Sequence, residues 1–397
     1  MTAVLEDARP SAHEYAWNIG VAYCGDAGKA GTWSGTPASL GNAIRGHGAS
    51  VVAVKAQAAP VVETLVAHAL TLLRVPRTPG ATLKQRARLS RTISLYTGRE
   101  MSPLRSRGLR KEIRRAMPLD AIVQIQTNYA VPAGLPIATL EDMTVAQALE
   151  LPYPEWRALS KREKAAGLAR QQRAYERASV CCFMTQWAAD SAIEDYGIPR
   201  EKTVIVGVGR NHSPEPVDRD WATPRYLFVG GDWIRKNGDA IVKAFARIRE
   251  TIPAARLDLV GSHPDVDADN VFGHGWLSLA DAAERRQLDG LFEAATCFVM
   301  PSLCEPSAIS YLEAGAAGVP SIGSTVGGSR ELIGDGGCVV DPHDHEALFE
   351  AMLELADGEV ARKAGERALA RADWWTWPNV AARILAALEP HVSATRR

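Results

Sequence analysis

Short apolar runs alternate with helix-length stretches along this chain, and the alternation occurs twice. Runs that end at glycine or polar residues predict buried parallel strands at 18–24, 50–55, 120–125, 180–185 and 203–206. After a polar interval, the pattern predicts further strands at 226–230, 256–261, 296–300, 320–323 and 337–341. Strands that alternate with helices form a parallel sheet covered by helices. We therefore predict an α/β protein with two Rossmann-like domains facing a central cleft, with ligands at the carboxyl ends of the strands.

The polar, Pro-containing stretch His212–Thr223 is the best candidate for a linker between the domains. At 397 residues the chain is too long for one ordinary core. The predicted domains are residues 1–211, which begin with a loose leader over 1–17, and residues 212–373. Residues 374–397 would form a last helix that crosses back to the N-terminal domain.

Composition excludes several classes of protein. The net charge of −1 implies no broad attraction to nucleic acid or membranes, and no apolar run reaches the ~18 residues of a membrane span. The N-terminus lacks the basic and apolar regions of a signal peptide, and the six scattered cysteines form no Cys-x-x-Cys pair. These features predict a cytoplasmic protein with buried thiols.

Residues 74–115 are unusually basic, with 13 Lys and Arg against Glu100 and Glu112. Two interpretations stay open for this segment. It forms solvated helix faces, or it forms a positive surface for an anionic acceptor or a membrane. We favour the first, so membrane contact is possible here but is not the expected role.

The most informative motif is Cys304–Gly315, which follows a predicted strand. Glu305 lies in the strand-to-helix turn, and Ser307 is expected to cap the helix. The free N–H groups near Ala308 and Ile309, together with the helix dipole, form a phosphate site. Glu313, two turns on, can reach a ribose diol, whereas Glu305 is placed to meet a sugar beyond the phosphates.

Two glutamates separated by seven residues, Glu305 and Glu313, resemble the Glu-x7-Glu signature of retaining GT-B glycosyltransferases of family 4. The flanking segments Phe298–Ser302, Ala317–Ile322 and Val326–Ile333 are similar to the family's segments on either side. The resemblance covers about 180–397 well and the N-terminal half more loosely. It implies a C-terminal domain that binds a nucleotide-sugar and an N-terminal domain that binds the acceptor.

The segment Phe228–Gly238 resembles the family's strand followed by a basic pair that holds the donor diphosphate. Fixed cations there would stabilise the charge that develops on the leaving nucleoside diphosphate. Lys236 matches this pattern. Many family members carry an arginine directly after the strand's glycine, where this chain has Gly231 and Asp232, so Arg235 is assigned the second catalytic cation.

The N-terminal half offers weaker candidates. The loop Gly25–Pro37 resembles the family's glycine-containing loop that faces the donor phosphates, with Gly35 and Thr36 as binding residues, Thr36 as N-cap and Pro37 at N1. Gly28 and Gly31 would allow close approach of a ligand. The family often places a histidine near the acceptor, but none occurs between His68 and His212. Asp142 is our substitute; it could instead be a loop carboxylate that caps the next helix.

Asp265–Asp269 contains the Asp-x-Asp pattern of metal-dependent glycosyltransferases, but it is predicted to be a hydrated loop. No metal or other cofactor is therefore expected. The sequence predicts a glycosyltransferase that uses a UDP- or GDP-sugar and retains configuration. The acceptor is a sugar, a natural product or a lipid carrier with a free hydroxyl or thiol. A sugar-nucleotide epimerase or a phosphorylase of similar fold is the alternative, and a non-enzymatic nucleic-acid binder is a remote one.

Overall fold

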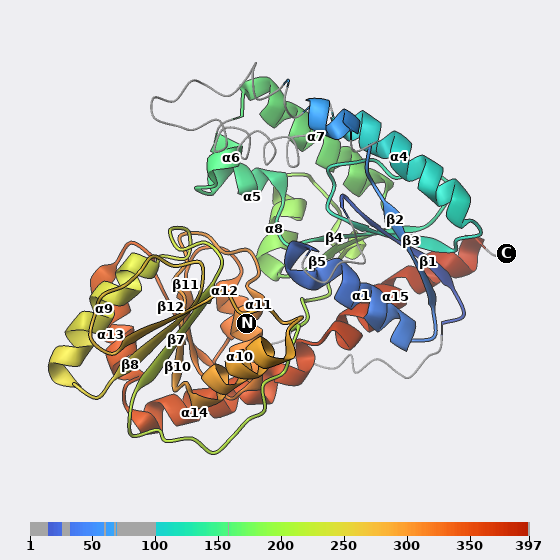
Figure 1. Cartoon of the computed structure of the whole chain (residues 1–397). Helices are drawn as coiled ribbons and strands as arrows, with labels where there is room; N and C mark the ends of the chain where they lie inside the picture. Colours follow the sequence, from blue (N-terminus) through green and yellow to red (C-terminus); the bar gives the residue numbers. More distant parts are fainter. Residues whose placement is uncertain are drawn as a thin grey trace. The chain divides into compact units, whose positions relative to one another are not determined.

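The computed structural model describes residues 15–25, 32–58, 61–66, 69, 101–157 and 159–395 (Figure 1). The chain divides into two compact units, Met1–Gly207 with Pro378–Arg397, and Val208–Trp377. The predicted linker His212–Thr223 lies in the second unit, where Arg219 donates hydrogen bonds to the carbonyl oxygens of Ala295 and Ala317. The last helix, α15 (Trp377–Thr395), groups with the first unit.

The first unit contains a six-stranded parallel sheet in the order β2-β1-β3-β4-β5-β6. Its strands are β1 (Asn18–Tyr23), β2 (Ser50–Lys55), β3 (Ala121–Ile125), β4 (Ile137–Glu141), β5 (Val180–Phe183) and β6 (Thr203–Ile205). Its described helices are η1 (Thr32–Gly35), α1 (Thr36–Gly46), α4 (Met101–Ala116), α5 (Val145–Glu150), α6 (Pro154–Arg157), α7 (Lys161–Arg177), α8 (Gln186–Glu194), η2 (Arg200–Lys202) and α15. The side chains of Tyr129, Tyr175 and Phe183 are fully buried in the core of this unit.

The second unit repeats this architecture, with strand order β12-β11-β10-β7-β8-β9 and parallel pairing throughout. Its strands are β7 (Arg225–Gly230), β8 (Arg256–Gly261), β9 (Val271–Gly275), β10 (Cys297–Val299), β11 (Ser321–Ser324) and β12 (Gly337–Val340). Its helices are α9 (Gly238–Thr251), α10 (Ala282–Ala294), α11 (Ile309–Ala316), α12 (Ser329–Ile333), α13 (His345–Glu354), α14 (Gly358–Arg371) and η3 (Ala372–Trp374). Buried aromatic rings, among them Phe228, Phe245 and Phe298, fill its core.

The predicted fold class is thus confirmed: two parallel doubly wound sheets, each covered by helices. All ten predicted strands are present, with ends that differ by at most two residues. The structure adds β4 and β9, whose sequences carry polar residues or glycines, namely Thr139 and Glu141 in one, Gly273 and His274 in the other. None of the described helices is long and apolar enough to cross a membrane.

Candidate functional site

The strand order of the second sheet places two loops side by side. Strands β7 to β9 are added toward one edge of the sheet, and β10 to β12 are added toward the other. The strand order therefore reverses between β7 and β10, which are hydrogen-bonded neighbours. In open parallel sheets, ligands bind outside the carboxyl ends of the strands at such a switch point. The loop after β7 carries Arg235 and Lys236, and the loop after β10 carries Glu305. These are the residues that the sequence assigned to the donor site.

The structure brings these three side chains into direct contact. Lys236 Nζ lies 2.9 Å from Glu305 Oε2, and Arg235 Nη1 lies 3.0 Å from the same oxygen. Ser302 Oγ is a further donor, 3.4 Å from that oxygen. Glu305 and Lys236 are 6% and 9% exposed, so two cations and one carboxylate share a site nearly closed to water.

The ionisation of this cluster is set by competition between burial and charge. Burial raises the pKa of Glu305, but the charges of Lys236 and Arg235 outweigh that effect and leave its pKa below the usual value. Burial lowers the pKa of Lys236 more than its contact with Glu305 raises it. Glu305 is therefore ionised at neutral pH and pairs with two cations. The cluster carries a net positive charge, which suits an anionic ligand.

Glycines create the space for this cluster. A Cβ added at Gly230 would lie 2.4 Å from Lys236 Cδ, so the lysine stem can pass over the end of β7 only because residue 230 is glycine. Gly327 has a φ of +87° and lies so close to Glu305 that an added Cβ would come within 2.1 Å of the Glu305 carbonyl oxygen. Gly328 N–H donates to that carbonyl at 3.1 Å. The Val326–Ile333 segment thus supports the backbone of Glu305.

The expected phosphate-binding residues lie at the start of α11, with one correction. The helix begins at Ile309, its N-cap is Ala308, and no side chain caps it. Ser307 is therefore not the cap. A bridge between Glu305 and Gly327 keeps the chain extended, and Ala308 itself is still extended at φ −71° and ψ 116°. An uncapped helix start leaves N–H groups available for an anion.

Glu313 lies one turn after Ile309, not two turns after the helix start, because the helix starts later than predicted. Its side chain is 9% exposed, and Oε2 lies 3.4 Å from His212 Nε2. His212 was predicted as a linker residue, and its contact with Glu313 has no signal in the sequence. The two residues are separated by about a hundred positions, and only the fold brings them together.

The first loop of the N-terminal unit is described from Thr32 onward, and Gly28 and Gly31 lie outside the described residues. Gly35 is the N-cap of α1 at φ +78°, so Thr36 is the first helical residue and neither the predicted N-cap nor Pro37 at N1 is correct. Trp33 and Ser34 also have positive φ, at 44° and 53°. Such a turn is sterically unfavourable for residues with a Cβ, and such strain clusters at functional sites.

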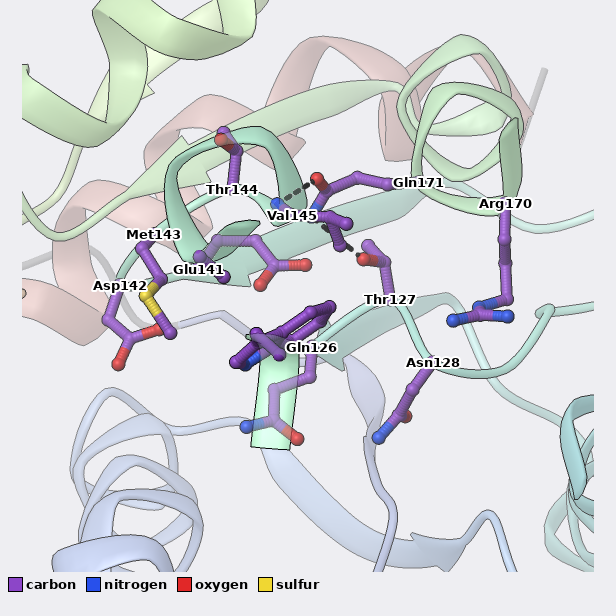
Figure 2. A pocket seen from close by; sticks show the side chains of 12 residues that line it. Gln126, Thr127, Asn128, Glu141, Asp142, Met143, Thr144, Val145, Arg170 and Gln171 are labelled. Atoms are coloured by element: carbon purple, nitrogen blue, oxygen red, sulfur yellow. Dashed lines mark hydrogen bonds between the residues drawn. The ribbon is translucent and has the colours of Figure 1, made fainter. Parts of the chain in front are cut away.

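A small pocket lies at the carboxyl ends of β3 and β4 in the first unit (Figure 2). Its lining includes the predicted Asp142, together with Gln126, Thr127 and Glu141. Asp142 does not cap the next helix, because Thr144 and Gln147 form that cap. Gln126, directly after β3, has a φ of +62°, which is uncommon for a residue other than glycine.

Glu141 is the residue of this pocket that the sequence analysis missed. It is 4% exposed, and its Oε1 is buried without a hydrogen-bond partner among the described residues. Burial, followed by the charge of Asp142, raises the pKa of Glu141 well above its usual value. Burial therefore favours the protonated, neutral form of Glu141. A glutamate as the last residue of a buried strand was the available signal, but the sequence predicted no strand there.

The family-model match with known proteins lies within the second unit. Residues 223–358 match the family model described as "Glycosyl transferases group 1". The chain is 26% identical over 168 residues to a sucrose-phosphate synthase of Spinacia oleracea, covering 36% of this chain and 16% of that protein. It is 36% identical over 106 residues to the O-antigen chain mannosyltransferase B of Escherichia coli, covering 26% of this chain and 28% of that protein.

A solved sucrose-phosphate synthase from Thermosynechococcus elongatus has the same fold, with a TM-score of 0.68 and 18% identity over 95% of this chain and 100% of that chain. The expected resemblance to glycosyltransferases of the GT-B fold is thereby confirmed. The curated relatives match over a limited part: this chain spans less than a third of the length of each of the two named above. Membership of family 4 stays a prediction.

Proposed function

Because the chain is related to the group 1 glycosyltransferases, we propose that it transfers a sugar from a nucleoside-diphosphate sugar to an acceptor. The observation that carries this proposal is the contact of Arg235 and Lys236 with Glu305 at the switch point of the second sheet. A nearby uncapped helix, α11, offers N–H groups to the same ligand. Two cations and a helix N-terminus suit a diphosphate.

The chemistry explains why the cations are held so firmly. As the glycosidic bond of the donor breaks, negative charge develops on the β-phosphate. Lys236 and Arg235 would stabilise that charge without reorganising, because Glu305, which accepts a hydrogen bond from Ser302, already fixes them. Glu305 then has two roles: it orients both cations, and it lies where it can meet the donor sugar. Glu313 would accept hydrogen bonds from the ribose hydroxyls, and Ser307, Ala308 and Ile309 would contact the phosphates.

Two mechanistic features belong to the proposal. Transfer would retain the anomeric configuration of the donor, and the coupling constant of the anomeric proton in the product tests this. Transfer would need no metal, because protein cations serve the diphosphate. Asp269 of the Asp-x-Asp loop pairs instead with Arg249 at 3.1 Å. We expect turnover to survive EDTA; complete loss that Mn²⁺ or Mg²⁺ restores would contradict this.

The first unit would bind the acceptor, through the pocket of Asp142 and Glu141. Its amide and hydroxyl side chains Gln126, Thr127 and Asn128, beside a neutral acid, suit the hydroxyl groups of a sugar or a polar natural product. The donor would be a UDP- or GDP-sugar, and the enzyme would act in the cytoplasm. Lipid-linked acceptors fit the same chemistry. The basic segment 74–115 lies largely outside the described residues, so it contributes nothing to this assignment.

Thermal-shift measurements with UDP, GDP, ADP and dTDP test the proposal most directly. A ligand that binds only the native state stabilises it, by about 2.7 kcal/mol at a ligand concentration of 100 Kd, and so raises the melting temperature. We expect one nucleoside diphosphate to stabilise the protein more than its monophosphate does, with EDTA present. If no nucleotide stabilises the protein, the proposed donor site is wrong. Product analysis with the matching nucleotide-sugar then separates a transferase, which needs an acceptor, from an epimerase, which does not.

A further inference from the structure

His212 is held between two carboxylates in the second unit. Its Nδ1 lies 2.8 Å from Asp289 Oδ1 of α10, and its Nε2 lies 3.4 Å from Glu313 Oε2 of α11. The His212 side chain is only 7% exposed, and its ring packs against Phe292 at a centroid distance of 5.6 Å. Among the described residues, His212 is the one side chain that forms an ion pair with Glu313.

Only one protonation state of the ring suits both neighbours. A neutral imidazole carries one N–H. If that hydrogen points to Asp289, the lone pair of Nε2 faces the negative charge of Glu313. The imidazolium instead presents an N–H and a positive charge to both carboxylates, with a hydrogen bond to Asp289 and an ion pair with Glu313. Burial lowers the pKa of His212, but Glu313 and Asp289 raise it more, so the net pKa lies above the usual value of 6.5.

We propose that His212, as the imidazolium, is the positioning residue that orients Glu313 to accept the ribose hydroxyls of the nucleotide. This inference rests on the proposed function, which assigns the ribose to Glu313. An ion pair at Oε2 fixes the rotamer of Glu313 and directs its remaining acceptor sites to the ligand. Preorganisation of this kind improves binding because less side-chain freedom is lost when the ligand arrives.

The charged groups around His212 come from several elements. Asp289 and Glu313 contact it directly, from α10 and α11. Arg210, two residues before His212, is close enough to Glu313 for their charges to interact, and Asp373 of η3 acts on Arg210 in turn. Burial lowers the pKa of Arg210, yet an arginine stays charged throughout the range in which histidine titrates. His212 is therefore the group whose charge changes near neutral pH.

The test compares a ribonucleotide with its 2′-deoxy counterpart. Calorimetry with UDP and 2′-deoxy-UDP, or with GDP and 2′-deoxy-GDP if guanine binds better, gives the ratio of the two dissociation constants from pH 5.5 to 9. Phosphate titration affects both nucleotides equally, so the ratio reports the ribose contact. We expect the ribonucleotide to bind about tenfold more tightly at low pH. That preference should fall toward about one as pH rises through the pKa of His212, because the imidazolium is lost.

Two variants and a control sharpen this test. In Asp289→Asn the preference should fall at lower pH than in the wild type, because removing that charge lowers the pKa of His212. In His212→Phe, which keeps an aromatic ring beside Phe292, the preference should be small at every pH while the diphosphate still binds. His345→Gln, an exposed histidine at the start of α13, should match the wild type.

The outcomes separate the two hypotheses. If no nucleoside diphosphate binds, the proposed function itself is wrong. If the nucleotide binds but its preference for ribose does not change with pH, or is unaffected in Asp289→Asn, the role of His212 is wrong while the proposed function stands. A tighter ribose contact in His212→Phe would also overturn the proposal, because it would show that His212 competes for Glu313. Should His212→Phe fail to fold, the wild-type and Asp289→Asn profiles still decide.

Discussion

Two buried glutamates, one in each unit, lie at the carboxyl ends of strands in similar parallel sheets, and their pKa values are shifted in opposite directions. Glu305 is 6% exposed and Glu141 is 4% exposed, so burial acts on both in the same direction. Burial raises the pKa of each, yet Lys236 and Arg235 bring the pKa of Glu305 below its usual value. For Glu141, the charge of Asp142 adds to burial, and its pKa lies well above the usual value.

The difference shows how one residue type supports two kinds of recognition. An ionised carboxylate between two cations can hold them in place for an anionic ligand. A neutral carboxylic acid can donate a hydrogen bond as well as accept one, which suits uncharged hydroxyl groups. Thr127 and Gln171, which are hydrogen-bonded to each other at 3.0 Å, also bond to Glu141, and these bonds lower its pKa without overcoming burial. Because burial raises the pKa of both glutamates, the neighbouring charges account for the difference between them.

The largest expected effect is on stability, from Glu305→Gln. The substitution keeps the shape of the side chain but leaves Lys236, which is only 9% exposed, without its anionic partner. Removing one member of a buried ion pair costs about 3–5 kcal/mol, and we expect a loss near the lower value because Arg235 is partly exposed. Urea denaturation at pH 7 measures it.

The pH dependence of that loss of stability tests whether it comes from the ionised form of Glu305. A carboxylate with a lowered pKa contributes stability above its unfolded-state pKa, and the contribution disappears as pH falls through the folded-state pKa. The difference between Glu305→Gln and the wild type should therefore shrink in acid. A difference that is constant with pH would mean that Glu305 is not an ionised partner.

Lys236→Ala should have the next largest effect, this time on turnover. Removing a fixed cation that stabilises developing charge lowers kcat by about 10²–10³, and nucleotide affinity should fall less, because the contact strengthens in the transition state. Arg235→Ala should change kcat in the same direction. Steady-state release of nucleoside diphosphate from the nucleotide-sugar, with circular dichroism to confirm folding, measures these effects.

The matched control is Lys243→Ala. Lys243 is an exposed lysine of α9, the helix that follows Lys236 directly. It should keep wild-type kcat. If Lys236→Ala were as active as Lys243→Ala, the diphosphate assignment would fail.

A smaller effect is expected from Glu313→Ala, on ground-state binding. A hydrogen bond to a charged group contributes about 1.5–3 kcal/mol, so the dissociation constant of the nucleoside diphosphate should rise about 10- to 150-fold. Calorimetry on the folded variant measures it, with Glu354→Ala, a substitution on the exposed face of α13, as the comparison. An unchanged affinity would remove Glu313 from the site.

The fold and the positions of Glu305, Lys236 and Arg235 beside one sheet edge could be predicted because they depend on local patterns. Continuous apolar runs mark buried parallel strands, and the Glu305 and Lys236 segments each follow such a run closely. The start of α11 was placed too early, because the bridge between Glu305 and Gly327 joins segments that no local rule connects.

The pocket of Glu141 and Asp142 and the contact of His212 could not be predicted in the same way. Strand β4 has Thr139 and Glu141 at buried positions, where apolar residues usually stand, so its sequence resembles a loop. His212 lies in a Pro-containing polar stretch typical of linkers, and its partners Asp289 and Glu313 lie on two different helices. In both cases the surroundings of a buried polar side chain come from residues that are distant in the sequence.

The smallest expected effect is the change in stability from Glu141→Gln, which completes the comparison of the two glutamates. Since Glu141 holds a proton in the folded protein that it loses on unfolding, wild-type stability should fall as pH rises from the unfolded-state pKa toward the raised folded-state pKa. Glutamine holds no such proton, so the variant should match the wild type near pH 5 and become the more stable protein at higher pH. The gain cannot exceed about 1.4 kcal/mol per pH unit. This is the opposite slope to that of Glu305→Gln, from the same chemical change. Urea denaturation of Glu141→Gln and the wild type from pH 5 to 8 measures the Glu141 slope, whereas the Glu305 slope is measured below pH 5, because the pKa of Glu305 is lowered from its usual 4.5. A difference between Glu141→Gln and the wild type that stays constant from pH 5 to 8 would show that Glu141 is ionised and that the two pockets do not differ in charge.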